Sequence, residues 1–184
     1  INALSAIESA SAGRVLFAPT GLLHPGLKRL LDVRRVVGLR NPAHSLVKLM
    51  MPVAGNAVLV SSYTHPEYLQ SMSATLALTR TPALLLRGTE GEPVADARRT
   101  PAMDAFASGV VTRVQDAQTG PLAQLPDLPG TAPADTAAWI RRVLAGDAPV
   151  PPPIAQQVAH IVALTRTAFA SPAADADTPQ AHAV

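Results

Sequence analysis

The sequence contains no cysteine and very few aromatic residues. Of its 184 residues none is cysteine, and only 3% are Phe, Trp or Tyr. The lack of cysteine excludes disulfides, thiolate metal sites and thiol nucleophiles, and it is typical of a cytoplasmic protein, which is our expectation. With so few aromatic side chains the core must be built from Leu, Val, Ile and Ala. The apolar content of 48% is sufficient for one globular domain of this length.

Long apolar runs and a recognisable leader are also lacking. No stretch of about 18 consecutive apolar residues occurs, so we expect no membrane span and no membrane partner. Residues 1–4, Ile-Asn-Ala-Leu, lack an initiating Met and any signal-peptide pattern. We therefore expect that the natural beginning is missing and that the chain is a fragment.

Positive charge is concentrated in the first 50 residues. The whole chain has a net charge of +2, but residues 1–50 hold seven Lys or Arg against two acidic residues. Six of the seven follow one another closely: Lys28, Arg29, Arg34, Arg35, Arg40 and Lys48. Such a segment raises the local affinity for the phosphates of a nucleotide or a nucleic-acid backbone. A solvated helix face is the alternative interpretation.

Apolar spacing predicts short helices in this basic segment. The run 15–18 fits either a strand or the end of a helix. An amphipathic helix is expected from His24-Pro25 to about Gly38. A second, less regular segment covers 40–50, with Pro42 in its first turn.

The middle of the chain predicts a strand–helix–strand unit. Residues 56–61 and 83–86 are short apolar runs typical of buried strands, and Pro66 opens a helix that extends through Leu76. Such a unit places its two strands parallel with a right-handed crossover. We therefore predict an α/β fold with a mostly parallel sheet and helices on both faces.

The last third predicts one more strand and two helices. Residues 110–114 suggest a strand near the sheet edge, and a helix is expected over 135–144, with Asp135 as its cap and Gly146 as its stop. A final helix is expected over 154–169, after three prolines. Residues 171–184 lack a core pattern and predict a disordered tail, so the α/β domain is assigned to residues 1–170.

Motifs for several common chemistries are missing. The five histidines form no HExxH or HxxxH pair, and no serine lies in a GxSxG elbow. Neither the GxxxxGK[ST] nor the GxGxxG phosphate loop occurs. The sequence therefore identifies no catalytic residue and no cofactor, and it gives poor support for a zinc site.

Residues 18–49 resemble a stretch of the anthranilate phosphoribosyltransferases. In those enzymes F-A-x-x-x-H-P-A-M-K is followed by V-R-x-x-L-G-x-R-T-x-F-N-x-L-G-P-L, and the spacing agrees here without a gap. The resemblance implies that His24 and Arg34 correspond to acceptor-pocket residues, because a guanidinium matches a carboxylate or phosphate. The other interpretations are a helix-start residue for His24 and an ion pair for Arg34. The chain departs from the pattern at Val47-Lys48, where the enzymes have Gly-Pro.

A second segment of the resemblance covers residues 87–93 and reads Arg-Gly-Thr-Glu-Gly-Glu-Pro. At this place the enzymes have H-G-x-D-G-L-D-E, and the Asp-Glu pair of that motif binds magnesium. Glu90 and Glu92 are candidate oxygen ligands for a hard cation, although a solvated acidic turn is the simpler interpretation. A basic turn, Arg98-Arg99, follows and can extend the positive surface.

Three segments in order resemble the YbiB-like branch of this superfamily, also called glycosyltransferase family three. They are R-N-P-A-H-S-L-V-K-L, S-Y-T-H-P-E-Y and L-R-G-T-E-G-E-P-V-A-D, and the resemblance covers roughly residues 14–165. It implies the C-terminal α/β domain of nucleoside phosphorylase- and phosphoribosyltransferase-type proteins, nucleic-acid binding, and a homodimer formed through helices that precede this chain. The family's G-T-G-G-D, N-x-S-T and K-H-G-N phosphate motifs do not occur here.

These observations support a main hypothesis and two alternatives. The main one is a DNA- or RNA-binding domain that uses the six basic residues on phosphates. The first alternative is a phosphoribosyl or glycosyl transferase with an unidentified acceptor, which would need Mg²⁺ and phosphoribosyl diphosphate. The second is an inactive domain with a structural role only.

Overall fold

The computed structural model describes residues 13, 15–53, 55–122 and 126–170, and its centre is a mixed β-sheet. The strands lie in the order β1-β2-β3-β4. Their bounds are β1 Leu59–Tyr63, β2 Ala83–Arg87, β3 Met103–Ala107 and β4 Val110–Gln115. The pair β1–β2 is parallel, whereas β2–β3 and β3–β4 are antiparallel.

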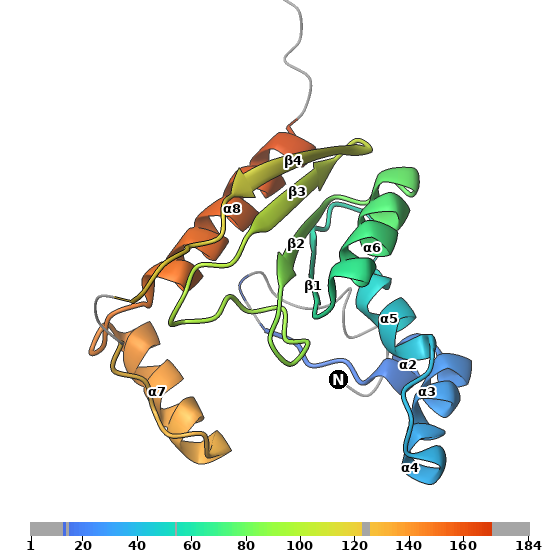
Figure 1. Cartoon of the computed structure of the whole chain (residues 1–184), viewed down its shortest axis with the longest axis horizontal. Coiled ribbons are helices and arrows are strands. Elements are labelled where there is room, and N and C mark those ends of the chain that lie inside the picture. Colours follow the sequence, from blue (N-terminus) through green and yellow to red (C-terminus); the bar gives the residue numbers. More distant parts are fainter. Residues whose placement is uncertain (1–12, 14, 54, 123–125, 171–184) are drawn as a thin grey trace, which may run out of the picture.

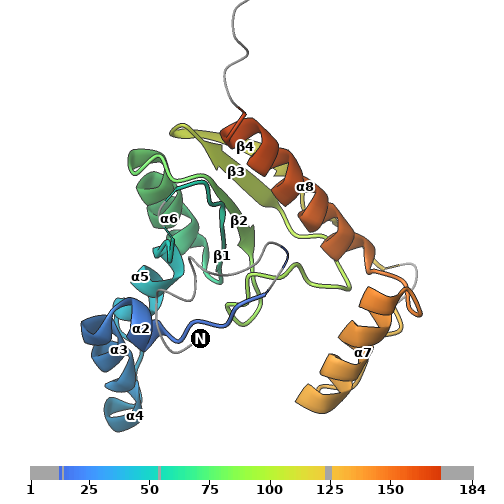
Figure 2. The ribbon, with the colours of Figure 1, turned by 180° about the vertical axis from the view of Figure 1, so that it is seen from behind.

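Two helices cover opposite faces of this sheet (Figures 1 and 2). Helix α6, Pro66–Leu78, joins β1 to β2, and α8, Pro152–Ala168, follows the other face. Alternate residues of β2 separate the two cores, as expected from the side-chain period of a strand. Leu85 packs with Met72 and Leu76 of α6, whereas Leu84 and Leu86 pack with Leu164 of α8. The predicted α/β class, the strand–helix–strand unit and the helices on both faces are confirmed.

The arrangement of the sheet corrects part of the expectation. A mostly parallel sheet was predicted, but one of the three strand pairs is parallel, because β3 and β4 form a hairpin. The hairpin turns at Ser108 and Gly109, which both have positive φ. The predicted edge strand is β4, but β3 was not foreseen. The strand expected over 56–61 lies at Leu59–Tyr63, and the run 15–18 forms neither strand nor helix.

The basic segment forms an arm of short helices beside β1 (Figure 1). We call residues 20–49 the helical arm; it comprises α2 Thr20–Leu23, α3 Pro25–Asp32, α4 Arg34–Val37, α5 Ala43–Leu46 and the 3₁₀ helix η1 Val47–Leu49. The expected helix after His24 is confirmed, although it is interrupted at Val33. It ends at Gly38, whose φ of 75° suits the left-handed conformation that glycine adopts without strain.

Helix α7, Pro133–Ala145, projects from the other side of the molecule (Figures 1 and 2). Gly146 ends it with a φ of 85°, as predicted. Asp135 is not its cap: Ala132 holds that position, and Asp135 lies in the first turn. Within the described residues no helix is long and apolar enough to cross a membrane. The predicted tail, 171–184, lies outside the described residues.

Candidate functional site

A cavity of about 500 Å³ lies at the carboxyl end of β1, between the helical arm and the start of α6. This edge of an open α/β sheet is where ligands usually bind. The polar and aromatic side chains that line it come from both sides: Arg40, Asn41, His44, Ser45, Lys48, Ser62, Tyr63, Thr64, His65, Tyr68 and Ser71. Of the six basic residues predicted to contact phosphate, Arg40 and Lys48 line this cavity.

Two serines of β1 hold Lys48 in place. Ser61 Oγ donates to the Lys48 carbonyl oxygen at 2.9 Å. The Lys48 Nζ donates to the Ser62 carbonyl oxygen at 3.0 Å and lies 3.4 Å from Ser62 Oγ. Both serines are buried. The sheet therefore fixes both the backbone and the ammonium group of Lys48.

The environment of Lys48 disfavours its positive charge. Burial is the main cause that lowers the pKa of Lys48, and the nearby Arg40 guanidinium lowers it further. Glu92 acts in the opposite direction and raises it. Two neighbouring cations, one of them partly desolvated, form a local field that attracts an anion.

The loop after β2 folds back onto the end of β1 and reaches Lys48. A Cβ added at Gly88 would lie 2.7 Å from the Glu92 carbonyl oxygen and 3.2 Å from Ser62 Cβ, so the contact requires glycine. A Cβ added at Gly91 would lie 3.0 Å from Lys48 Nζ. The Lys48 ammonium therefore lies directly against the segment that carries the two candidate metal ligands.

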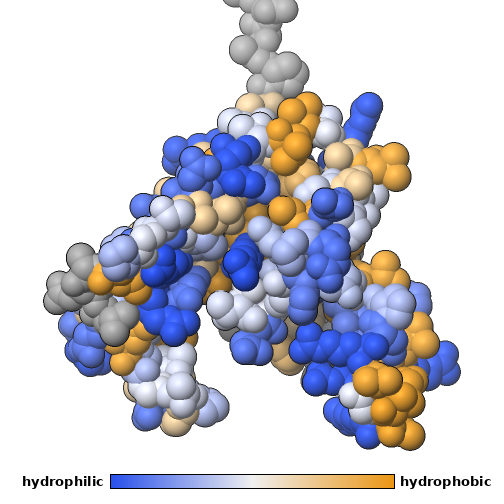
Figure 3. All heavy atoms as spheres, viewed as in Figure 1, coloured by the Kyte–Doolittle hydropathy of each residue, from blue (hydrophilic) through white to orange (hydrophobic). Residues whose placement is uncertain are grey.

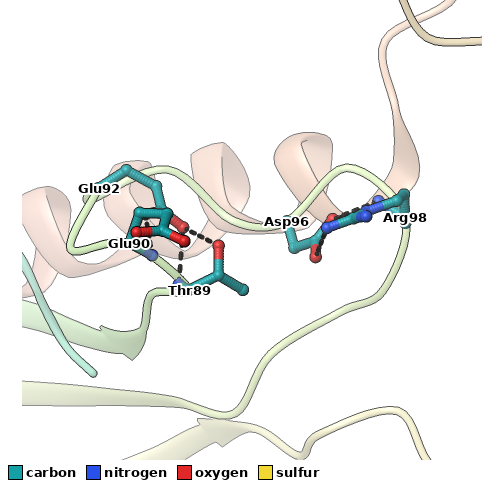
Figure 4. Close-up of polar contacts among 5 residues, drawn as sticks. All are labelled: Thr89, Glu90, Glu92, Asp96 and Arg98. Atoms are coloured by element: carbon teal, nitrogen blue, oxygen red, sulfur yellow. Dashed lines mark hydrogen bonds and ion pairs between the residues drawn. The ribbon is translucent and has the colours of Figure 1, made fainter. Parts of the chain in front are cut away.

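The Glu92 carboxylate is turned toward its own loop (Figure 4). One oxygen accepts from Thr89 N at 2.8 Å and Thr89 Oγ1 at 2.9 Å, and the other accepts from Glu90 N at 2.8 Å. Burial alone would raise the pKa of Glu92, but these hydrogen bonds outweigh it and lower the pKa. Among the described residues no group of three His, Cys, Asp or Glu could hold a metal ion.

The other four predicted phosphate contacts lie on α3 and α4, outside the cavity. Lys28 is paired with Asp32, and Arg35 Nε lies 3.8 Å from an Asp32 oxygen. In the part of the chain that the structure describes, Arg29 and Arg34 form no side-chain hydrogen bond or ion pair. The charges of Arg29 and Arg34 are therefore not neutralised locally.

His24 acts as a helix cap in this structure. Its Nδ1 accepts a hydrogen bond from the backbone N–H of Leu27 at 2.9 Å, at the start of α3. Its ring and the Arg34 side chain do not line the cavity. The structure therefore does not bring these two proposed acceptor-pocket equivalents to the same place as Arg40 and Lys48.

The basic turn at 98–99 serves to order its loop. Arg98 Nε and Nη2 donate to the two Asp96 oxygens at 2.9 and 2.8 Å (Figure 4). This bidentate contact is the main cause that lowers the pKa of Asp96. Arg99 Nη1 donates to the Gly120 carbonyl oxygen at 2.8 Å. Both guanidinium groups are therefore engaged within the protein.

A second cavity, of about 700 Å³, lies between α7 and the proline-rich segment before α8. Its charged lining residues have both signs: Arg98, Arg142, Asp127 and Asp147. It therefore has no net preference for an anion. The cavity beside Lys48 is the better candidate for a phosphate site.

Several cavity residues were not identified from sequence. Ser61 and Ser62 were not assigned a role, although they are the residues that hold Lys48. His65 and Tyr68, whose rings meet edge to face with centroids 6.1 Å apart, were not singled out. The sequence did offer one signal for them. The segment S-Y-T-H-P-E-Y follows the carboxyl end of a predicted parallel strand, which is where ligands bind in open α/β sheets.

No family model matches the chain, but two curated proteins are similar to it. "Uncharacterized protein YbiB" of Escherichia coli (strain K12) is 36% identical over 152 residues, which cover 82% of this chain and 47% of YbiB. "Anthranilate phosphoribosyltransferase" of Colwellia psychrerythraea (strain 34H) is 31% identical over 134 residues, which cover 71% of this chain and 36% of that protein.

The chain spans less than half the length of these curated relatives. Both similarities nevertheless extend over more than two thirds of the chain, and the observed α/β architecture agrees with the fold that the resemblance implied. The chain therefore belongs to the anthranilate phosphoribosyltransferase superfamily, on its YbiB-like branch.

Proposed function

We propose that the chain is a nucleic-acid-binding domain that contacts backbone phosphates without reading sequence. Within the helical arm, α3 and α4 supply Arg29 and Arg34, and the part that lines the cavity supplies Arg40 and Lys48. Lys and Arg side chains on phosphates release counterions and give affinity that does not depend on base identity.

One observation carries this proposal: the pair Arg40 and Lys48 converges on a cavity that offers no carboxylate among its lining residues. Like charges that are close together and partly desolvated destabilise each other. A bound phosphate would neutralise both. The cost of this arrangement in the free protein is therefore offset when an anion is present.

The scarcity of aromatic residues favours phosphate contacts over base stacking. The chain has one Trp, two Tyr and three Phe. Platforms that bind single strands by stacking need several exposed rings along the strand path. We therefore expect similar affinity for strands of different sequence.

A second candidate function is a transferase for phosphoribosyl or glycosyl groups with an unidentified acceptor. It is favoured by the similarity to a protein named anthranilate phosphoribosyltransferase. Under this alternative Mg²⁺ and phosphoribosyl diphosphate are the expected ligands. No catalytic residue is assigned to it.

Oligonucleotide binding across a salt series tests the main proposal. Fluorescent single- and double-stranded DNA and RNA of mixed sequence are titrated with the complete protein, beside an Arg29→Ala/Arg34→Ala variant. The matched control is Arg141→Ala/Arg166→Ala, which removes two exposed charges from α7 and α8.

We expect a steep loss of affinity with salt, and a slope that is about 1–2 smaller in the arm variant, because each lost phosphate contact contributes about 0.9. The control should keep the full slope. Absence of binding at low salt, or an equal loss in the control, would overturn the proposal.

A further inference from the structure

We infer that Arg40 and Lys48 form a subsite for one phosphate group that works without a metal ion, with the Lys48 ammonium as its resident positive charge. This inference rests on the proposed function and makes it more specific. The ligand is the phosphate of a nucleotide, either free or part of a strand.

The ammonium group is fixed in place before any ligand arrives. It is anchored by the Ser62 carbonyl and hydroxyl oxygens, at 3.0 and 3.4 Å, and it lies against Gly91. A lysine ammonium has three donors. Two of them reach Ser62, so the third is available to an anion in the cavity.

A divalent cation does not fit this arrangement. Both oxygens of Glu92 accept hydrogen bonds from the loop itself, and the Lys48 ammonium is already in the field of this carboxylate. A Mg²⁺ ion here would face the charges of Lys48 and Arg40 at short range. It would also lack the oxygen-rich shell that it requires. The residues present therefore do not suit the metal that the superfamily's transferases use.

The rest of the cavity can accommodate the remainder of a nucleotide. Its volume of about 500 Å³ falls within the usual range of small-molecule sites, about 300–1,000 Å³. Thr64 and His65 line it at the start of the 13-residue helix α6 and add a hydroxyl group and an imidazole ring to its polar wall.

Phosphate binding in the absence of metal tests the inference. The complete protein is titrated with inorganic phosphate and with adenosine monophosphate in EDTA, followed by ³¹P NMR, and the titrations are repeated with excess Mg²⁺. In a parallel arm, oligonucleotides with and without a 5′-phosphate are compared. The variants are Lys48→Met and Lys48→Arg, and thermal unfolding confirms that each is folded.

We expect binding of both small ligands in EDTA, no more than a twofold change with Mg²⁺, and at least a tenfold loss in Lys48→Met that Lys48→Arg largely restores. Tighter binding of the 5′-phosphorylated strand would identify a strand end as the source of the phosphate. If the two strands bind equally, a loss of strand affinity in Lys48→Met would identify an internal phosphate, and no such loss would identify the free nucleotide. Each of these results agrees with the inference.

A requirement for Mg²⁺, or unchanged phosphate binding in folded Lys48→Met, would overturn it. If oligonucleotides bind with the expected salt dependence while phosphate does not bind in EDTA, the subsite is wrong and the proposed function stands. If phosphate binds and oligonucleotides do not, the proposed function is wrong and the subsite stands.

Discussion

At the scale of single residues, the loop beside Lys48 depends on a glycine that tolerates no side chain. Gly88 is buried between the Glu92 carbonyl oxygen and Ser62, and the nearer of these is a backbone atom that a rotamer change cannot move. The residue requirement here is therefore steric.

We predict that Gly88→Ala destabilises the protein by about 1–3 kcal/mol, because a Cβ 2.7 Å from the Glu92 carbonyl oxygen forces the loop to shift. Urea unfolding measures the effect. Gly21→Ala is the control: it lies in α2, its added Cβ meets only Lys28 at 3.5 Å, and it should be neutral or slightly stabilising. Equal stability of Gly88→Ala and the parent protein would contradict this account of the loop.

Glu92 should make the stability depend on pH. Its pKa is lowered in the folded state, so its contribution is complete above the unfolded value of 4.5 and is lost as the pH falls through the lower folded pKa. We predict that Glu92→Gln flattens the acid side of the stability curve. Urea unfolding between about pH 7 and pH 3 tests this, with Glu90→Gln as the control that keeps the acid dependence. Parallel curves for Glu92→Gln and the parent protein would show that the hydrogen bonds to Thr89 and Glu90 do not stabilise the loop.

At the scale of elements, α8 organises the long connection between β2 and β3. Gln157 is 4% exposed; its Oε1 accepts from Ala95 N at 2.8 Å, and its Nε2 donates to the Pro93 carbonyl oxygen at 2.7 Å. One amide thus satisfies two backbone groups of a loop that has no regular structure of its own.

We predict that Gln157→Leu destabilises the protein by about 2–4 kcal/mol, because both backbone partners lose their hydrogen bond and one of them lies in a buried residue. Thermal and urea unfolding give the magnitude. Gln156→Leu should have a smaller effect, since Gln156 is exposed and accepts one hydrogen bond, from Thr100. If Gln157→Leu and Gln156→Leu had the same stability, the side chain of Gln157 would not be what holds the connection between β2 and β3.

Some helices and strands could be predicted from the sequence, and others could not. Strands β1 and β2 and helix α6 were predictable, because their apolar residues are continuous or lie at helical spacing. Strand β3 was missed because Asp104 interrupts its apolar pattern. That carboxylate is paired across the hairpin with Arg113. Ser108-Gly109 was the available signal, as a two-residue turn with positive φ joins adjacent antiparallel strands.

The sequence identified the cations that contribute to the candidate site, but not which of them lie together at the cavity. The charge count identified Arg40 and Lys48 together with four other cations. Only tertiary packing distinguishes them: Arg35 and Lys28 are close to Asp32, whereas Lys48 is held by a strand that begins eleven residues farther along the chain. Contacts of this kind leave no local pattern in the sequence, so the cavity emerged only from the fold.

At the scale of the whole molecule, the helical arm and α7 project from either side of the sheet (Figures 1 and 2). On the arm, hydrophilic and hydrophobic surface lie side by side (Figure 3). Val36 is 90% exposed, Leu39 is 69% exposed and Val37 is 58% exposed. Contiguous apolar surface of this kind promotes association between protein molecules.

We predict that the chain self-associates through this apolar end of the arm and that Val36→Ser/Val37→Ser weakens the association at least severalfold. Sedimentation velocity over a concentration series measures it. Leu144→Ser, at an exposed apolar position of α7, is the control and should leave the association unchanged. A parent chain that stays monomeric at every concentration would contradict the prediction. The homodimer expected from the family resemblance remains a separate prediction.

Because Lys48 is held by β1 while the arginines of α3 and α4 are exposed, the two groups should affect different rates of the proposed interaction with nucleic acid. Exposed arginines on short helices act at long range and govern how fast a strand arrives, whereas a charge fixed by the sheet in a cavity governs how long it stays. In the proposed complex, loss of Arg29 and Arg34 would mainly slow association, and loss of Lys48 would mainly shorten the residence time. The association rate and the residence time would then depend on different residues of one surface, so that a substitution could change one rate without changing the other.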